Sequence, residues 1–156
     1  MKIIRNNVFE TNSSSTHSLT LCDTSDFEDW KNGQLMYHMK KDKLITLDEA
    51  HEEYVRQAII YKAMKNREGD SGYEYGGIFV DSSNDWDKLF TEGNLASITE
   101  EDIEQVKNND DGWFCTEELP MTYQDYQNWL DYSESYYPIE QSYKDVTAFG
   151  YYGTNY

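Results

Sequence analysis

A short polar stretch near the N-terminus carries the side-chain types that a hydrolytic site uses. Thr11–Ser18 reads Thr-Asn-Ser-Ser-Ser-Thr-His-Ser, so an imidazole lies close in sequence to several hydroxyl groups. In such a site His17 would act as general base, with Glu10 or Asn12 orienting its ring. The candidate nucleophiles are Ser13, Ser14 and Ser15. The same hydroxyls and amides would also suit a bound phosphate.

A plainer interpretation of the same residues is a local turn. Asn, Ser and Thr side chains hydrogen-bond to their own backbone and favour turns. A catalytic triad, in contrast, is recognised by its geometry. We therefore expect a polar turn at Thr11–His17 between strands at Lys2–Val8 and Ser18–Cys22. A small enzyme or a ligand-binding protein built on Thr11–Ser18 is the alternative function.

Carboxylates dominate the rest of the chain. Residues 1–67 contain ten Lys/Arg and ten Asp/Glu, whereas residues 68–156 contain three and twenty. The formal charge of −17 therefore falls entirely on the second part. Such a charge repels DNA, RNA and anionic membranes, so we expect none of them to bind directly. The asymmetry instead predicts a basic partner.

Several of these acids fall at helical spacing. Side chains three or four positions apart on a helix lie about 5–6 Å from each other, as Glu100 and Glu104 would. Carboxylates held in this way pair with the Lys and Arg side chains that otherwise bind phosphates. The expected partner-binding residues are Asp85, Asp87, Glu100, Glu101, Glu104, Asp110 and Asp111. Tyr126 and Trp129 would add aromatic contacts unless they are buried.

The charge pattern leads to a functional hypothesis. The protein would mimic a nucleic acid and inhibit a host DNA- or RNA-binding defence protein by occupying its basic groove at a fixed ratio. A Cas nuclease or a restriction enzyme is the expected kind of partner. The alternative for the charge itself is a solvated surface that keeps the protein soluble and monomeric.

The segment Asn7–Ser18, Asn-Val-Phe-Glu-Thr-Asn-Ser-Ser-Ser-Thr-His-Ser, resembles the N-terminus of small uncharacterised proteins of phages and of bacteria such as Firmicutes. The resemblance covers Met1–Cys22 and implies no activity. It does imply a phage or mobile-element origin. That origin raises the expectation of a host-defence inhibitor, with class-level similarity to acidic anti-CRISPR and anti-restriction proteins.

Metal and cofactor sites are not predicted. The cysteines and histidines have no recognised ligand spacing; they are Cys22, Cys115, His17, His38 and His51. Asp81, Asp85 and Asp87 offer oxygen ligands, but the glycine and closing glutamate of an EF-hand are absent. Two distant cysteines favour a reduced compartment. The N-terminus lacks an apolar stretch of signal-peptide length, so we expect the cytoplasm of a bacterial host cell.

The elements that would position these residues predict a single α+β domain over residues 1–156. It would consist of a small mixed sheet of N-terminal strands packed with three to four helices, with a C-terminal strand as a candidate member. Expected helices are Thr46–Asn66, Asp85–Thr91, Thr99–Lys107 and Thr122–Ser133. Expected strands, besides those flanking the polar turn, are Leu35–Met39, Ile78–Val80 and Val146–Tyr152, with a loop at Gly69–Gly77 and a break at Pro138.

Overall fold

The computed structural model describes residues 3–5, 9–12, 15–66, 72–81, 83–109, 112–133 and 135–154. The chain forms two compact units. The sheet unit comprises Met1–Leu47 and Pro120–Tyr156, and the inserted unit comprises Asp48–Leu119. Neither boundary coincides with the change in charge after residue 67. The fold class is α+β, as the sequence predicts.

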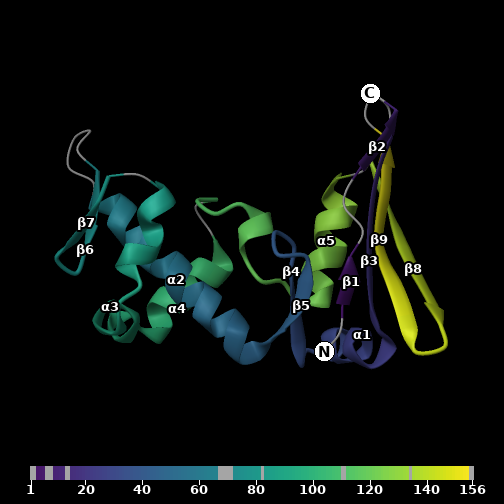
Figure 1. The fold of residues 1–156 in the computed structure, drawn as a ribbon, viewed down its shortest axis with the longest axis horizontal. Helices are drawn as coiled ribbons and strands as arrows, with labels where there is room; N and C mark the ends of the chain where they lie inside the picture. Colours follow the sequence, from purple (N-terminus) through teal and green to yellow (C-terminus); the bar gives the residue numbers. More distant parts are fainter. Residues whose placement is uncertain are drawn as a thin grey trace. The chain divides into compact units, whose positions relative to one another are not determined.

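The sheet unit is built on one antiparallel sheet (Figure 1). Its strands follow the order β1-β3-β9-β8, and β2 also pairs with β3. They are β1 (Ile3–Arg5), β2 (Phe9–Asn12), β3 (Ser15–Asp23), β8 (Tyr136–Tyr143) and β9 (Val146–Thr154). The C-terminal strand joins the sheet as expected, with Thr20 opposite Phe149. All pairings among the described residues are antiparallel, so the sheet is not mixed as predicted.

Two helices cover one face of this sheet. Helix α1 (Thr24–Lys31) contacts β3 and β9, and α5 (Tyr123–Ser133) contacts β8 and α1 (Figure 1). Every second side chain of a strand points into the layer between the sheet and the two helices, because the side chains of a strand alternate between its faces. Trp30 and Phe149 form the centre of this core and are almost fully buried. The strands β4 (Leu35–His38) and β5 (Lys43–Thr46) form a second hairpin. A β-bridge between Tyr37 and Met121 connects this hairpin to the segment that precedes α5.

The inserted unit is mainly helical. Its first helix, α2 (Leu47–Lys65), runs nearly as far as predicted. The helical spacing of Leu47, Ala50, Tyr54, Ala58 and Tyr61 predicts one apolar face, and all of these residues are buried except Leu47, which is 50% exposed. The remaining elements are β6 (Tyr73–Tyr75), β7 (Ile78–Val80), the 3₁₀ helix η1 (Ser83–Leu89), α3 (Glu92–Ser97), α4 (Glu100–Asn108) and the 3₁₀ helix η2 (Thr116–Glu118).

Some sequence predictions are wrong in detail. Thr11 and Asn12 lie in β2 and Ser15–His17 in β3, so most of the predicted polar turn is strand. The predicted Gly-rich loop contains β6, which pairs with β7. The helix predicted at Asp85–Thr91 is the 3₁₀ helix η1. The elements α1, β5, α3, η2 and β8 were not predicted.

Candidate functional site

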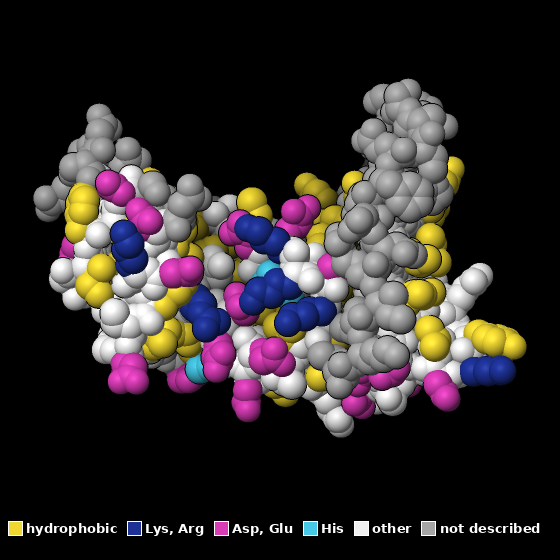
Figure 2. Space-filling model, in the orientation of Figure 1, with side chains coloured by type: hydrophobic (Ala, Val, Ile, Leu, Met, Phe, Trp, Pro, Cys, Tyr) yellow, Lys and Arg dark blue, Asp and Glu magenta, His cyan; other side chains and the backbone are white. Residues whose placement is uncertain are grey.

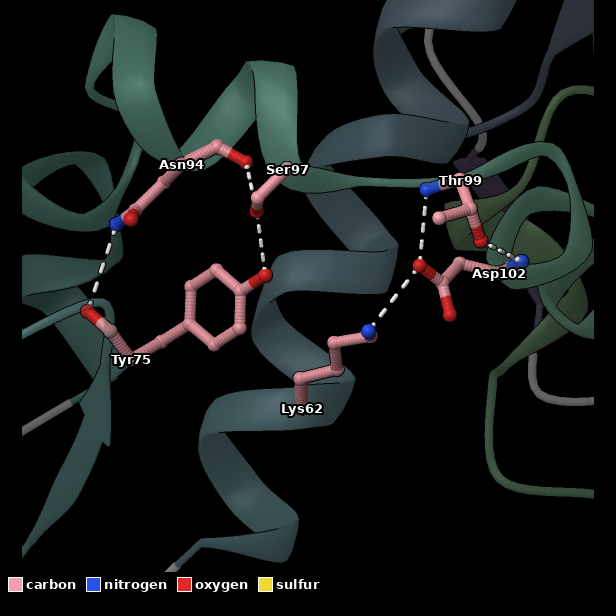
Figure 3. A network of polar contacts seen from close by, with 6 residues as sticks. All are labelled: Lys62, Tyr75, Asn94, Ser97, Thr99 and Asp102. Carbon is pink, nitrogen blue, oxygen red and sulfur yellow. Dashed lines mark hydrogen bonds and ion pairs between the residues drawn. The ribbon is translucent and has the colours of Figure 1, made fainter.

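The acidic helix α4 is fixed by its own first turn. The backbone N–H of Asp102 donates to Thr99 Oγ1 at 3.2 Å, and the Thr99 N–H donates to Asp102 Oδ2 at 2.9 Å (Figure 3). This capping box satisfies amides that lack partners at a helix start. Ile103 and Val106 are both 1% exposed. The opposite side of the helix therefore presents acidic side chains, namely Glu100, Glu101 and Glu104.

Asp102 also holds a basic residue of α2. Lys62 Nζ lies 3.1 Å from Asp102 Oδ2 (Figure 3). Burial by itself raises the pKa of this carboxyl group, but the hydrogen bonds from Thr99 and Lys62 outweigh it and lower the pKa below its usual value. Asp102 is consequently a structural carboxylate, and Lys62 adds no free positive charge to the surface.

A second contact joins the same two helices near their N-terminal ends. His51 Nε2 of α2 lies 3.8 Å from Glu100 Oε1 of α4, and the Glu100 side chain is 86% exposed. Two further acids, Asp48 and Glu52, are exposed on the first turns of α2. Sequence reasoning misses these two acids, because they belong to a stretch that is neutral overall.

The 3₁₀ helix η1 carries the other described acids of the predicted surface. Asp85 Oδ1 lies 3.7 Å from Lys88 Nζ, whereas Asp87 is exposed. Thr91 caps the helix that follows, because its hydroxyl accepts a hydrogen bond from the Asn94 N–H at 3.2 Å. Local capping thus fixes the backbone at this end of the inserted unit.

The charge is divided unequally between the two units. Asp48–Leu119 contains nineteen Asp/Glu and six Lys/Arg, a formal charge of −13, and the rest of the chain carries −4. The inserted unit is therefore the acidic part of the protein. The sequence alone places this charge after residue 67, a division that splits α2 from the elements that pack against it.

The basic residues described in the inserted unit all contact partners within it. Arg56 lies 3.5 Å from Glu53 Oε1 and 5.8 Å from the Phe90 ring centroid. Lys107 lies 3.8 Å from Glu104 Oε1 and 5.3 Å from the Tyr54 ring. Lys62 and Lys88 pair with carboxylates of the unit, and Lys65 lies 4.5 Å from the Tyr61 ring. Each of these basic side chains therefore already interacts with a carboxylate or an aromatic ring of the same unit.

Many carboxylates remain without such compensation. The exposed acids of the inserted unit that have no ion-pair partner among the described residues are Asp48, Glu52, Asp81, Asp87, Glu92, Glu101 and Glu117. They come from several elements rather than from one helix. On the face shown in Figure 2, acidic side chains are interspersed with basic ones and do not form one continuous row. On this face the acidic side chains are thus separated from one another rather than gathered in one ridge.

The structure brings together only part of the predicted set. Asp85, Asp87, Glu100, Glu101 and Glu104 all belong to the inserted unit, while Asp110 and Asp111 lie outside the described residues. The two aromatic residues of the predicted set, Tyr126 and Trp129, belong to the sheet unit. Tyr126 is only 4% exposed and Trp129 is half-buried against the rings of Tyr136 and Tyr151. Tyr126 is therefore a core residue and offers no surface for a partner.

The alternative site in the polar stretch is described only at the level of its backbone. Ser15 and His17 lie in β3, with His17 opposite both Phe9 and Tyr152. Ser13 and Ser14 lie outside the described residues, as do the side chains of Ser15 and His17. The catalytic interpretation of these residues stays a prediction.

Neither a metal-binding cluster nor a membrane-spanning helix occurs among the described residues. No group of three or more His, Cys, Asp or Glu side chains is arranged to hold a metal ion in that part of the chain. None of the described helices combines the length and the apolar character needed to cross a bilayer. Comparisons with protein-family models, curated proteins and solved structures give no match to this chain.

Proposed function

We propose that the inserted unit binds a basic, nucleic-acid-binding surface and blocks it. The protein would act at a fixed ratio as an inhibitor of a DNA- or RNA-binding defence protein of a bacterial host, of the anti-CRISPR or anti-restriction type. One observation supports this most directly: each basic side chain described in Asp48–Leu119 contacts a partner inside the unit, while many exposed carboxylates do not.

The physical argument is electrostatic. A unit with a formal charge of −13 attracts a surface rich in Lys and Arg over a distance of about a Debye length, roughly 8 Å at physiological salt. Such steering speeds association and makes it sensitive to salt. Carboxylates at fixed positions, such as Glu101 on α4, then accept hydrogen bonds from guanidinium groups.

The experiment titrates the protein against a Cas9-type nuclease and against a restriction nuclease, each with and without its DNA. We expect binding to the DNA-free form, competition with DNA, and an affinity that falls as salt rises. The variant Glu101→Lys/Glu104→Lys should weaken binding roughly tenfold or more, because it reverses two charges of the proposed contact.

A matched control reverses two exposed acids of the sheet unit, Asp131→Lys/Asp145→Lys. It changes the net charge of the protein by the same amount. The proposal is contradicted if neither nuclease binds at low salt, or if both double variants lose the same affinity. Equal losses would mean that only the total charge matters and that α4 is not the contact.

A further inference from the structure

An aromatic crevice opens in the sheet unit between α5 and the edge strand β8. Its volume is about 290 Å³, just below the usual range of roughly 300–1,000 Å³ for small-molecule pockets. A cavity of this size accommodates one small group rather than a cofactor. It is lined by rings from three elements and by one carboxylate, namely Phe27, Trp30, Tyr123, Tyr126, Phe149 and Glu140.

The rings of this aromatic crevice are arranged edge to face. The Phe27 and Tyr123 centroids lie 5.9 Å apart at 88°, and the Trp30 and Tyr123 centroids lie 5.0 Å apart at 85°. The face of an aromatic ring carries negative electrostatic potential and attracts cations within about 6 Å of its centroid. Phe27, Trp30, Tyr126 and Phe149 are at most 4% exposed, so the half-buried ring of Tyr123 is the one that a positively charged group would contact at this place.

A carboxylate adds negative charge at the same place. The Tyr123 hydroxyl donates to Glu140 Oε1 at 2.6 Å, which links α5 to β8. Burial, this hydrogen bond and the charges of Glu140 and Glu28 raise the pKa of Tyr123 to about 12, so its hydroxyl stays protonated at neutral pH. Glu140 is exposed and has no ion-pair partner among the described residues. Its charge is consequently available to a ligand.

The protein already places a cation of its own against this wall. Lys31 Nζ at the end of α1 lies 5.7 Å from the Phe27 centroid and 5.8 Å from the Tyr123 centroid. The Lys31 side chain is exposed, so its ammonium group is held there by the rings rather than by burial. Lys31 does not line the crevice itself, but its ammonium group lies near two of the rings that do, so it would compete with a second cation for them.

We infer that the aromatic crevice binds an organic cation, either an alkylammonium or a guanidinium group. The group would enter between α5 and β8, lie against Tyr123 and pair with Glu140. A free small amine and the end of a Lys or Arg side chain share this chemistry. The inference does not rest on the proposed function, because the crevice lies in the sheet unit and the proposed contact lies in the inserted unit.

The test uses choline, its neutral isostere 3,3-dimethylbutan-1-ol, and the N-acetyl amides of lysine and arginine. Binding is followed through the NMR signal of the Trp30 indole N–H, which donates to the Met121 carbonyl at the inner end of the core. We expect saturable shifts with a cation and none with the isostere. Binding of choline alone indicates a free amine, and binding of the amides indicates a partner side chain. Both results support the inference.

Three variants at exposed positions distinguish a cation site from nonspecific binding. Lys31→Met should tighten binding by roughly three- to tenfold, because it removes a competing charge about 6 Å from the rings. Glu140→Gln should weaken it by a similar factor. Lys144→Met is the matched control, since Lys144 lies 5.4 Å from the Tyr143 ring outside the crevice, and should change nothing. Equal binding of the isostere, equal effects of Lys31→Met and Lys144→Met, or no saturable shift would overturn the inference.

Discussion

Asn94 should be the most sensitive polar residue of the inserted unit. Its side chain is buried, with 6% exposed, and its Nδ2 donates to the carbonyl oxygens of Leu89 at 2.8 Å and Tyr75 at 3.4 Å. The Ser97 hydroxyl donates to the Asn94 carbonyl at 2.6 Å, so the Tyr75 hydroxyl must be the donor in its 2.5 Å contact with Ser97 (Figure 3). Asn94 thus joins α3 to η1 and to the β6–β7 hairpin.

The substitution Asn94→Asp keeps the shape of the side chain and removes its donor. At neutral pH a carboxylate would face two carbonyl oxygens inside a unit that already carries a charge of −13. A buried carbonyl without its partner costs about 1–3 kcal/mol, and the weak 3.4 Å bond adds little. With the buried charge included, we expect the free energy of unfolding to fall by about 2–4 kcal/mol.

The loss should depend on pH in a defined direction. Repulsion from the carbonyls raises the pKa of the introduced carboxyl group in the folded variant above that in the unfolded chain, which is about 3.9. The penalty is therefore absent below the unfolded pKa, because the protonated carboxyl group can donate again, and it grows as pH rises from the unfolded pKa toward the folded one. Urea unfolding at pH 4 and pH 7, with hydrogen exchange of the α3 amides, measures both quantities.

The control is Asn108→Asp, which makes the same charge change at an exposed position of α4. We expect it to cost less than about 0.5 kcal/mol at either pH. If Asn94→Asp unfolds no more readily than Asn108→Asp at neutral pH, then the contacts of Asn94 do not hold the hairpin and its hydrogen bonds contribute little to stability.

Three other experiments test the same physical reasoning elsewhere. Gly76→Ala should destabilise the inserted unit by more than about 1 kcal/mol, because Gly76 has φ +61° and an added Cβ would meet Asn94 Oδ1. Gly93→Ala should instead stabilise the unit by about 0.5–1 kcal/mol, because an added Cβ at this position of α3 meets open space. Equal Tm shifts of the two variants would contradict this reasoning. Thr99→Ala should cost about 1 kcal/mol in urea unfolding through loss of the capping bond to Asp102, and hydrogen-exchange protection should fall first in α4, whereas unchanged protection would rule out that role. Tyr123 should lose its proton near pH 12 rather than 10, so its contribution to stability is present below about pH 10 and is lost as pH rises toward 12. Ultraviolet titration of the difference spectrum between the protein and its Tyr123→Phe variant measures the pKa of Tyr123, and a pKa near 10 would contradict the hydrogen bond to Glu140.

Local signals in the sequence predict several elements well. Thr99 with Asp102 and Thr122 with Asp125 encode the starts of α4 and α5, because capping depends on residues three positions apart. The alternation after Val146 predicts β9 for the same local reason. The predicted burial of one face of α2 is also confirmed, apart from Leu47.

Features that depend on distant neighbours were missed. Pro138 is typical of a break, yet it lies in β8, an edge strand where a missing backbone donor is tolerated. The residue types of Thr11–His17 favour a turn, but pairing with β9 extends the segment from Ser15 onward as strand. In the candidate site, α4 was correctly located, whereas the burial of Tyr126 depends on rings of α1 and β9 that no local pattern reveals.

The insertion of one unit within the other has a consequence for synthesis on the ribosome. Strand β3 must wait for β9, whose partner residues lie as far apart as Ser15 and Thr154. The segment Asp48–Leu119 is contiguous and emerges complete while β9 is still untranslated. Since contiguous segments tend to fold as they emerge, we expect the acidic unit to fold before β9 pairs with β3 and completes the sheet. A nascent chain stalled after Leu119 would then already display the surface on which the proposed inhibition depends.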